Sequence, residues 1–166
     1  MSLKNLQIIQ AKVVEQRDLS HLLNRWRFKE ERIVFTNGCF DILHQGHLDY
    51  LSKAADLGSK LIVGVNSDDS VKRLGKGENR PLQDQKSRGL LIASLHFVDR
   101  VVIFHEDTPL ELIKIIQPDV LVKGSDYKVE EIVGHEVVLA KGGSVVPIDF
   151  LAGFSTSSIV EKARKK

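Results

Sequence analysis

Short apolar runs alternate with amphipathic segments along most of this chain. Five of the runs have the composition of buried parallel strands: 33–35, 60–66, 100–104, 119–122 and 144–148. Between and after them, apolar residues recur at helical spacing, which predicts helices that begin near His47 and at 82–95, 109–116, 132–141 and 156–164. Thr108 is the expected cap of the helix that begins at Pro109.

Strands that alternate with helices predict an α/β fold, a doubly wound, Rossmann-like parallel sheet of about five strands flanked by helices. Residues 4–31 show helical periodicity alone, so we expect 1–31 to be an N-terminal helical extension and 32–166 the main part of a single globular domain. Ligands of such sheets bind beyond the carboxyl ends of the strands, where the strand order reverses. If the first and fourth predicted strands are neighbours, the residues that follow them face each other across that crevice.

Composition limits the function classes. The 166 residues suffice for one domain with a substantial core, and 24 Lys+Arg against 22 Asp+Glu provide no basic field for nucleic acid. One cysteine excludes an internal disulfide framework and fits a reducing compartment. No apolar run approaches the roughly 18 residues of a membrane span, and no signal-peptide core is present at the N-terminus. We therefore expect a soluble, cytoplasmic protein without membrane or nucleic-acid partners.

The turn after the first strand carries the strongest chemical signal. His44 and His47 lie three residues apart at a predicted helix start, where unpaired backbone N–H groups and the helix dipole favour an anion. Gly46 between them allows a phosphate to approach the backbone. A zinc site would need more ligands than two histidines and the upstream Cys39, and histidines in the core or in a cap are the other alternative. Phosphate binding is the interpretation we favour.

Ten consecutive residues in this turn follow a known pattern. The segment 38–47 reads G-C-F-D-I-L-H-Q-G-H and resembles the G-x-F-D-x-x-H-x-G-H motif of the cytidylyltransferase-like branch of the nucleotidyltransferase superfamily. The resemblance implies that a sugar, alcohol or cofactor phosphate attacks the α-phosphate of a nucleoside triphosphate.

Three further stretches are polar and rich in glycine or hydroxyl groups. After the fourth strand, Lys123 could reach a phosphate, and Asp126 could accept hydrogen bonds from sugar hydroxyls or steer a metal. Hydroxyls in succession at 155–157, where the last helix begins, favour nucleotide contact over an ordinary cap.

The stretch 66–82 carries Lys72, Arg73, Lys76 and Arg80 without core spacing. It predicts a mobile loop that folds over a polyanionic substrate, or else a plain exposed loop. Arg80 lies directly before a helix, where a guanidinium can hold two phosphate oxygens.

Several segments together resemble one family more closely, the adenylyltransferases that make ADP-heptose. They are N-R-P-L, L-V-K-G-S-D-Y, I-V-G-H-E-V-V-L-A-K-G-G-S-V and G-F-S-T-S, and the likeness covers residues 30–164. It implies that ATP and D-glycero-β-D-manno-heptose 1-phosphate react to give ADP-heptose and pyrophosphate for the inner core of lipopolysaccharide. In many bacteria a sugar kinase domain precedes this domain. That domain is absent here, so a separate kinase would supply the sugar 1-phosphate, and a homodimer is expected.

The resemblance and the chemistry assign the following roles. Catalytic residues would be His44, His47 and Lys123. Nucleotide contacts would come from Asn37, Gly38, Phe40, Gly46, Arg80, Ser155, Thr156 and Ser157. The substrate-binding set would be Asp41, Asn66, Lys72 and Asp126, with Asp41 in a binding or positioning role. Mg²⁺ would be held mainly by ATP phosphates and water, with no protein metal ligands assigned and no prosthetic group.

Two alternatives remain. A CTP-dependent cytidylyltransferase could act on glycerol 3-phosphate or a similar alcohol phosphate such as ethanolamine phosphate. Its late motif resembles R-T-x-G-I-S-T-S, whereas residues 151–157 here read L-A-G-F-S-T-S and lack the Arg and Thr, which counts against CTP. The second alternative is a non-catalytic, nucleotide-binding regulatory subunit, because a fold does not imply activity.

Overall fold

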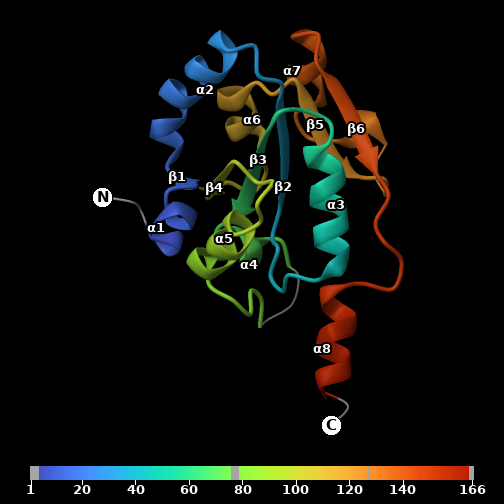
Figure 1. The fold of residues 1–166 in the computed structure, drawn as a ribbon. Helices are drawn as coiled ribbons and strands as arrows, with labels where there is room; N and C mark the ends of the chain where they lie inside the picture. The colour runs from blue at the N-terminus through green and yellow to red at the C-terminus, as the bar shows by residue number, and fades with distance from the viewer. Residues whose placement is uncertain (1–3, 76–78, 127, 165–166) are drawn as a thin grey trace.

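Six parallel strands form one sheet in the order β1-β4-β3-β2-β5-β6 (Figure 1). The computed structural model describes residues 4–75, 79–126 and 128–164. The strands are β1 (Val13–Val14), β2 (Ile33–Gly38), β3 (Lys60–Asn66), β4 (Arg100–Phe104), β5 (Val120–Gly124) and β6 (Ser144–Ile148).

Helices connect the strands and cover the sheet. They are α1 (Asn5–Gln10), α2 (Leu19–Phe28), α3 (Gln45–Ala55), α4 (Asp68–Arg73), α5 (Gln85–Ala93), α6 (Leu110–Ile116), α7 (His135–Ala140) and α8 (Thr156–Arg164), with 3₁₀ turns at Gln16–Asp18 and Val129–Glu131. The predicted doubly wound α/β fold is confirmed.

Each face of the sheet has its own apolar core. One core joins Leu23 and Trp26 of α2 and Ile113 of α6 to the face of the sheet that carries Phe35, and it also includes Val138 of α7. The other joins α3 and α5 to the opposite face, with Leu51 and Ile92 among its buried residues. Residues that alternate along β2 therefore face opposite cores, as expected of a strand covered on both sides.

The sheet has six strands rather than about five, because Val13 and Val14 pair with Val101 and Val102 of β4. These two residues lie in the segment for which periodicity predicted helices alone. A two-residue strand is too short to show alternation, so it leaves no signal in the sequence.

Three local predictions also differ from the structure. Asp68–Arg73 is the helix α4, within the stretch expected to be a loop, and Ser67 caps it by accepting a hydrogen bond from the Ser70 backbone N–H. Pro109, not Thr108, is the N-cap residue of α6. The helix expected over 132–141 is shorter, because a 3₁₀ turn and Gly134 precede α7.

The strand order reverses at β2, and this reversal positions the site. β2 pairs with β3 on one side and with β5 on the other, where Val34 is in register with Val120 and Phe35 with Leu121. The first and fourth strands predicted from the sequence are β2 and β5, and the prediction that they are neighbours is therefore confirmed. A crevice opens where such strands diverge at their carboxyl ends.

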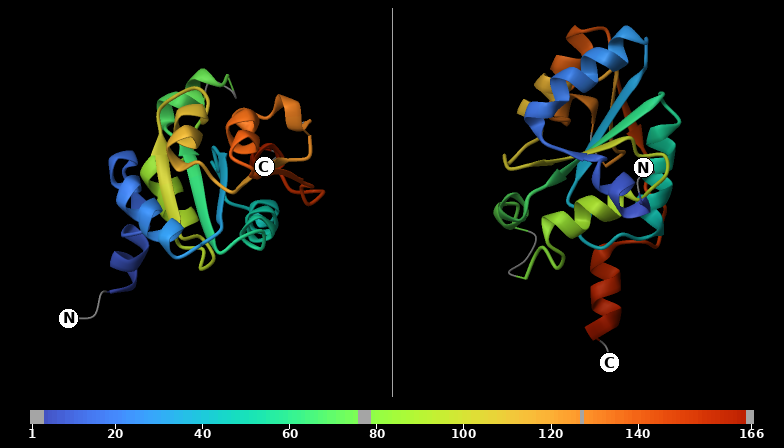
Figure 2. Two further views of the ribbon diagram at one scale, coloured as in Figure 1. Left: turned by 90° about the horizontal axis from the view of Figure 1, so that it is seen from above. Right: turned by 60° about the vertical axis from the view of Figure 1, so that its left-hand side comes forward.

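The last helix leaves the body of the molecule. In Figure 1 and in the right-hand view of Figure 2, α8 begins near the lower end of α3 and extends away from the sheet. Among the described residues, no helix has both the length and the apolar character needed to cross a membrane.

Candidate functional site

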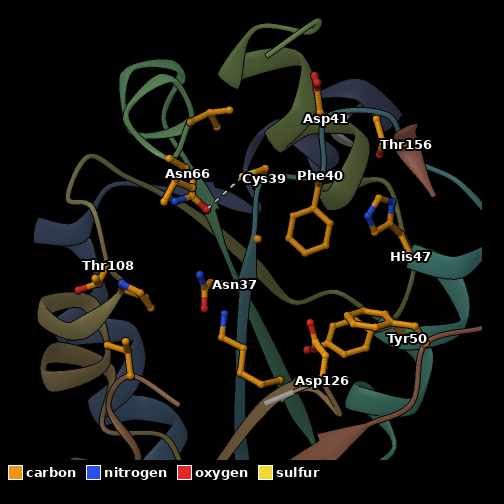
Figure 3. Close-up of a pocket in the computed structure, with 18 of the residues that line it drawn as sticks. Asn37, Cys39, Phe40, Asp41, His47, Tyr50, Asn66, Thr108, Asp126 and Thr156 are labelled. Atoms are coloured by element: carbon orange, nitrogen blue, oxygen red, sulfur yellow. Dashed lines mark hydrogen bonds between the residues drawn. The ribbon is translucent and has the colours of Figure 1, made fainter. Parts of the chain in front are cut away.

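A cavity of about 690 Å³ lies at the carboxyl ends of β2, β3 and β5. This size is within the range of small-molecule sites. Figure 3 shows Asn66 and Thr108 on one side of it and His47, Tyr50 and Thr156 on the other. The cavity brings together most of the predicted site residues: Asn37, Gly38, Phe40, Asp41, His47, Asn66, Arg80, Lys123, Asp126, Thr156 and Ser157.

The turn after β2 has an unusual backbone at Phe40. This residue is buried and has φ +48°, a left-handed backbone conformation that residues other than glycine and asparagine seldom adopt. The Phe40 ring packs on Gly38, where an added Cβ would lie 3.0 Å from two ring atoms. The same ring meets the His47 ring edge to face, with centroids 5.3 Å apart. The strained turn therefore braces the His47 imidazole.

The two histidines of the motif have different positions. His44 is the N-cap of α3, and its Nδ1 accepts a 3.4 Å hydrogen bond from the His47 backbone N–H. The two rings stack with centroids 3.8 Å apart, and His47 lines the cavity. Burial lowers the pKa of His44, so its imidazole is neutral at pH 7. His44 lies behind His47 rather than on the cavity wall.

Asp41 joins the motif to the segment that precedes α5. One carboxylate oxygen accepts hydrogen bonds from the backbone N–H groups of Leu82 and Gln83, at 2.7 and 3.0 Å, and the other accepts from Arg80. Burial alone would raise the pKa of Asp41, but these hydrogen bonds outweigh it and hold the pKa below its ordinary value. Asp41 therefore positions Arg80, which also lines the cavity.

A second arginine in this region was not predicted from the sequence. Arg88 of α5 is 0% exposed and donates to the carbonyl oxygens of Cys39 and Gln83 and to the carboxylate of Asp68, at 2.6, 3.0 and 2.7 Å. It connects the turn after β2 with the starts of α4 and α5. The available signal was its place one helical turn before the apolar Ile92, on the buried face of α5.

Polar side chains at the ends of β2 and β3 form the floor of the cavity. The Asn37 Oδ1 atom is buried and has no hydrogen-bond partner among the described residues. Asn66 is almost fully buried, its Nδ2 donates to Ser70 Oγ at 3.0 Å, and its Oδ1 lies 3.9 Å from the Cys39 sulfur. Lys123 approaches from the end of β5.

An aromatic corner lies beside Lys123. The rings of Tyr50 and Phe150 have centroids 5.3 Å apart and are tilted by 31°. The buried Tyr50 hydroxyl shares a 2.8 Å hydrogen bond with Thr36 Oγ1. Burial raises the pKa of Tyr50 to about 12, the Thr36 hydrogen bond offsets part of this effect, and the negative charge of Asp126 adds to it. Figure 3 shows Asp126 next to Tyr50.

The cavity wall is completed by the start of α8, where Thr156 and Ser157 line it. Ser155 instead has a capping role, because its Oγ accepts a 3.1 Å hydrogen bond from the Ser158 backbone N–H. Gly46 is buried between the His44 ring and Phe154, either of which would lie 3.1 Å from an added Cβ.

The basic residues of the 66–82 stretch, which were expected to lie over a substrate, do not lie together in the structure. Lys72 is exposed, pairs with Asp69 and does not line the cavity. Arg73 pairs with Asp107 and also donates to the His105 carbonyl oxygen. Lys76 lies outside the described residues. Within the described ranges, no group of three or more His, Cys, Asp or Glu side chains could hold a metal ion.

Comparison with curated proteins gives relatives at high identity. The chain is 57% identical over 146 residues to the bifunctional protein HldE of Nitrobacter hamburgensis, covering 88% of this chain and 30% of that protein. It is 56% identical over 159 residues to the bifunctional protein HldE of Helicobacter hepaticus, covering 96% and 32%. The chain thus spans about a third of the length of these relatives.

Two solved structures share the fold. The lipopolysaccharide core biosynthesis protein from Thermoplasma volcanium superposes with a TM-score of 0.60 at 32% identity, covering 73% of this chain and 97% of that one. The pantoate-beta-alanine ligase from Francisella tularensis, complexed with beta-gamma ATP and beta-alanine, gives a TM-score of 0.59 at 15% identity, covering 92% and 76%. At that identity the second likeness supports the fold alone.

The cytidylyltransferase-like family matches residues 35–162, from β2 into α8. This range contains the whole of the cavity lining described above. The chain therefore belongs to the cytidylyltransferase-like family of nucleotidyltransferases.

Proposed function

We propose that this chain transfers AMP from ATP to D-glycero-β-D-manno-heptose 1-phosphate, giving ADP-heptose and pyrophosphate. Identity of 55–57% to proteins named HldE over most of the chain supports this choice of reaction. The sequence segments that resemble ADP-heptose adenylyltransferases support it too, and so does the likeness to a lipopolysaccharide core biosynthesis protein.

One observation carries the proposal: His47 and Lys123 line the same cavity from the two sides of the strand-order reversal. A sugar phosphate oxygen is already a nucleophile, so the reaction needs no strong base. It needs two anions held together and stabilisation of the charge that develops on the α-phosphate. An imidazole and an ammonium group that face one cavity meet that demand.

The roles of the individual residues follow from their contacts. His47 would bind the reacting phosphate, with His44 stacked behind it as a support. Lys123 and Arg80 would neutralise phosphate charge, and Asp41 would hold Arg80 in place. Asp41 accepts three hydrogen bonds from its own chain, which favours positioning over substrate binding among the two roles expected for it.

The donor set fits a Mg²⁺ ion that is carried by its substrate. Of the carboxylates that line the cavity, Asp41 is engaged by Arg80 and two backbone groups, and Asp107 pairs with Arg73. Glu131 accepts a hydrogen bond from the Lys128 backbone N–H and Asp126 is exposed, and neither belongs to a group of three or more possible metal ligands among the described residues. Mg²⁺ retains water readily and binds phosphate oxygens, so ATP and water would supply most of its ligands and the ion would neutralise phosphate charge.

The proposed acceptor requires an enzyme that phosphorylates a sugar. The relatives are named bifunctional and are about three times as long as this chain, which is consistent with a kinase activity in a second domain. We propose that a sugar kinase activity supplies the sugar 1-phosphate, and that the reaction takes place in the cytoplasm. The expected homodimer would be tested by light scattering.

Pyrophosphate release tests the function. Purified protein with Mg²⁺ is given ATP or CTP, each with a panel of sugar 1-phosphates and with glycerol 3-phosphate and ethanolamine phosphate. The expected result is turnover with ATP and the heptose phosphate. Turnover with CTP and an alcohol phosphate would instead indicate a cytidylyltransferase. Nucleotide binding with no turnover on any acceptor would favour the regulatory alternative.

A further inference from the structure

Phe150 is a large apolar side chain that faces the cavity from the segment between β6 and α8. It lines the cavity, yet 53% of its surface is exposed, so one part of its ring is packed and another part is open. Exposed aromatic surface inside a substrate cavity is available for contact with a ligand.

The position of the ring depends on the glycine that follows Lys123. A Cβ added at Gly124 would lie 2.2 and 2.4 Å from the Cε2 and Cζ atoms of Phe150. These distances are far below van der Waals contact, so the ring lies directly against the backbone at the end of β5. Any larger residue at position 124 would displace it.

A second contact holds the ring from the α3 side. The Tyr50 ring packs against Phe150 and is itself almost fully buried, with its hydroxyl hydrogen-bonded to Thr36 of β2. Phe150 is thus held between the end of one central strand and a side chain tied to another. The open part of the ring forms a fixed apolar platform in the cavity.

Charge indicates which part of a substrate this platform receives. The carboxylate of Asp126 lies close enough to raise the pKa of Tyr50, and its Oδ1 would lie 2.5 Å from a Cβ at Gly124. A carboxylate repels phosphate groups, so this corner favours an uncharged, flat part of the ligand. Of the groups to which phosphate binding is assigned above, His47 and Arg80 belong to other parts of the same cavity lining. Lys123 directly precedes Gly124, so phosphates attached to a group on the ring would extend towards Lys123 and His47.

We propose, on the basis of the nucleotidyl transfer proposed above, that the nucleobase of the nucleoside triphosphate stacks on Phe150. Aromatic side chains are general platforms for bases because every base has a flat π-face. Counted back from Gly153, Phe150 occupies the position of the arginine in the R-T-x-G-I-S-T-S motif. A purine presents a larger flat face to an aromatic ring than a pyrimidine does, which makes Phe150 a specificity determinant for the nucleotide.

Equilibrium binding to the full chain tests the platform without requiring turnover. Phe150→Leu keeps an apolar side chain but removes the ring, and it should raise the Kd of ATP by roughly tenfold. The Kd of inorganic tripolyphosphate should not change, because that probe has no base. Phe154→Leu is the matched control, since Phe154 is also an exposed aromatic residue of the same segment but does not line the cavity.

Gly124→Ala is a second variant, because its Cβ would displace the Phe150 ring from its position against the backbone. It should weaken ATP binding in the wild-type background and have little further effect in Phe150→Leu. A fluorescent 2-aminopurine nucleoside triphosphate should be quenched on binding to the wild type and less so in either variant. An unchanged ATP Kd in Phe150→Leu, or equal loss of ATP and tripolyphosphate binding, would overturn the proposal.

Kinetics separate this proposal from the proposed function. A rise only in the KM of the sugar phosphate would overturn the base-stacking role and assign the ring to the acceptor. If no acceptor supports turnover, the proposed function fails while the binding measurements still decide whether a base stacks on Phe150.

Discussion

At the scale of single residues, the two motif histidines have different positions and contacts. His44 caps α3 and stacks on His47, and only His47 reaches the cavity wall. Two imidazoles this close would repel each other if both were protonated, and burial lowers the pKa of His44. A neutral His44 avoids that repulsion behind His47, which lines the cavity.

His47→Ala should therefore abolish turnover, with a fall in kcat of at least about a hundredfold, because a transition-state contact is lost. Pyrophosphate release measures the change, and far-ultraviolet circular dichroism should show an unchanged fold. Lys53→Ala, which removes an exposed partner of Asp49 on the same helix, is a control expected to retain activity. Near wild-type turnover of His47→Ala would mean that the site has been misidentified.

The Asp41 carboxylate predicts how the stability of the protein depends on pH. Its pKa in the folded protein is below the ordinary value, so its stabilising contribution is present above the unfolded-state pKa of about 3.9 and is lost as pH falls through the folded value. Asp41→Asn should lower the free energy of unfolding at pH 7 by about 1–3 kcal/mol.

The same variant should lose less stability than the wild type between roughly pH 5 and pH 2, because the titrating carboxylate is gone. Urea titrations at several pH values measure this difference. Asp84 also has a lowered pKa, through its hydrogen bonds to Ser87, but it titrates in both proteins and cancels in the comparison. Parallel pH profiles of the two proteins would contradict the role given to Asp41.

At the scale of elements, α5 holds the motif turn through one side chain. Arg88→Met removes the guanidinium that joins Cys39, Gln83 and Asp68. It leaves two carbonyl oxygens without their donor, so it should destabilise the protein by about 2–4 kcal/mol. Below the melting temperature, kcat should fall more than the KM of ATP rises, because the turn that braces His47 shifts.

A matched control separates positioning from general stability. Arg27 also donates to a carbonyl oxygen, that of Ile116, but at the opposite end of the molecule from the cavity. Arg27→Met should lower the melting temperature without changing kcat. If Arg88→Met lost only stability and kept its kcat, the positioning role would be wrong.

The elements show where sequence patterns predict structure and where they do not. The runs at 60–66, 100–104 and 144–148 are β3, β4 and β6 to the residue. For β3 and β4 the reason is that strands covered on both faces need continuous apolar residues, whereas β6 is a partly buried edge strand. β1 is two residues long and α4 is a short polar helix held by its cap, so neither has a period to detect. The polar composition of the 66–82 stretch predicted a loop, but the Ser67 cap and the burial of Val71 stabilise the helix α4 there.

At the scale of the whole molecule, the position of the cavity could be predicted from the sequence, and the contacts among its side chains could not. The motif at 38–47 and Lys123 each follow an apolar strand, so topology alone brings them to one crevice. The Asp41–Arg80 pair and the Phe150 platform join side chains far apart in the chain. Such contacts depend on how loops pack, for which a single sequence carries no periodic signal.

The central place of β2 also has a consequence for folding. β3 follows β2 after one helix, whereas β5 and the start of α8 come much later in the chain. During synthesis the first half of the sheet can therefore assemble well before the residues that close the other side have left the ribosome. A nascent chain at that stage still lacks β5 and the start of α8, so the cavity is completed only when the last elements have joined the sheet.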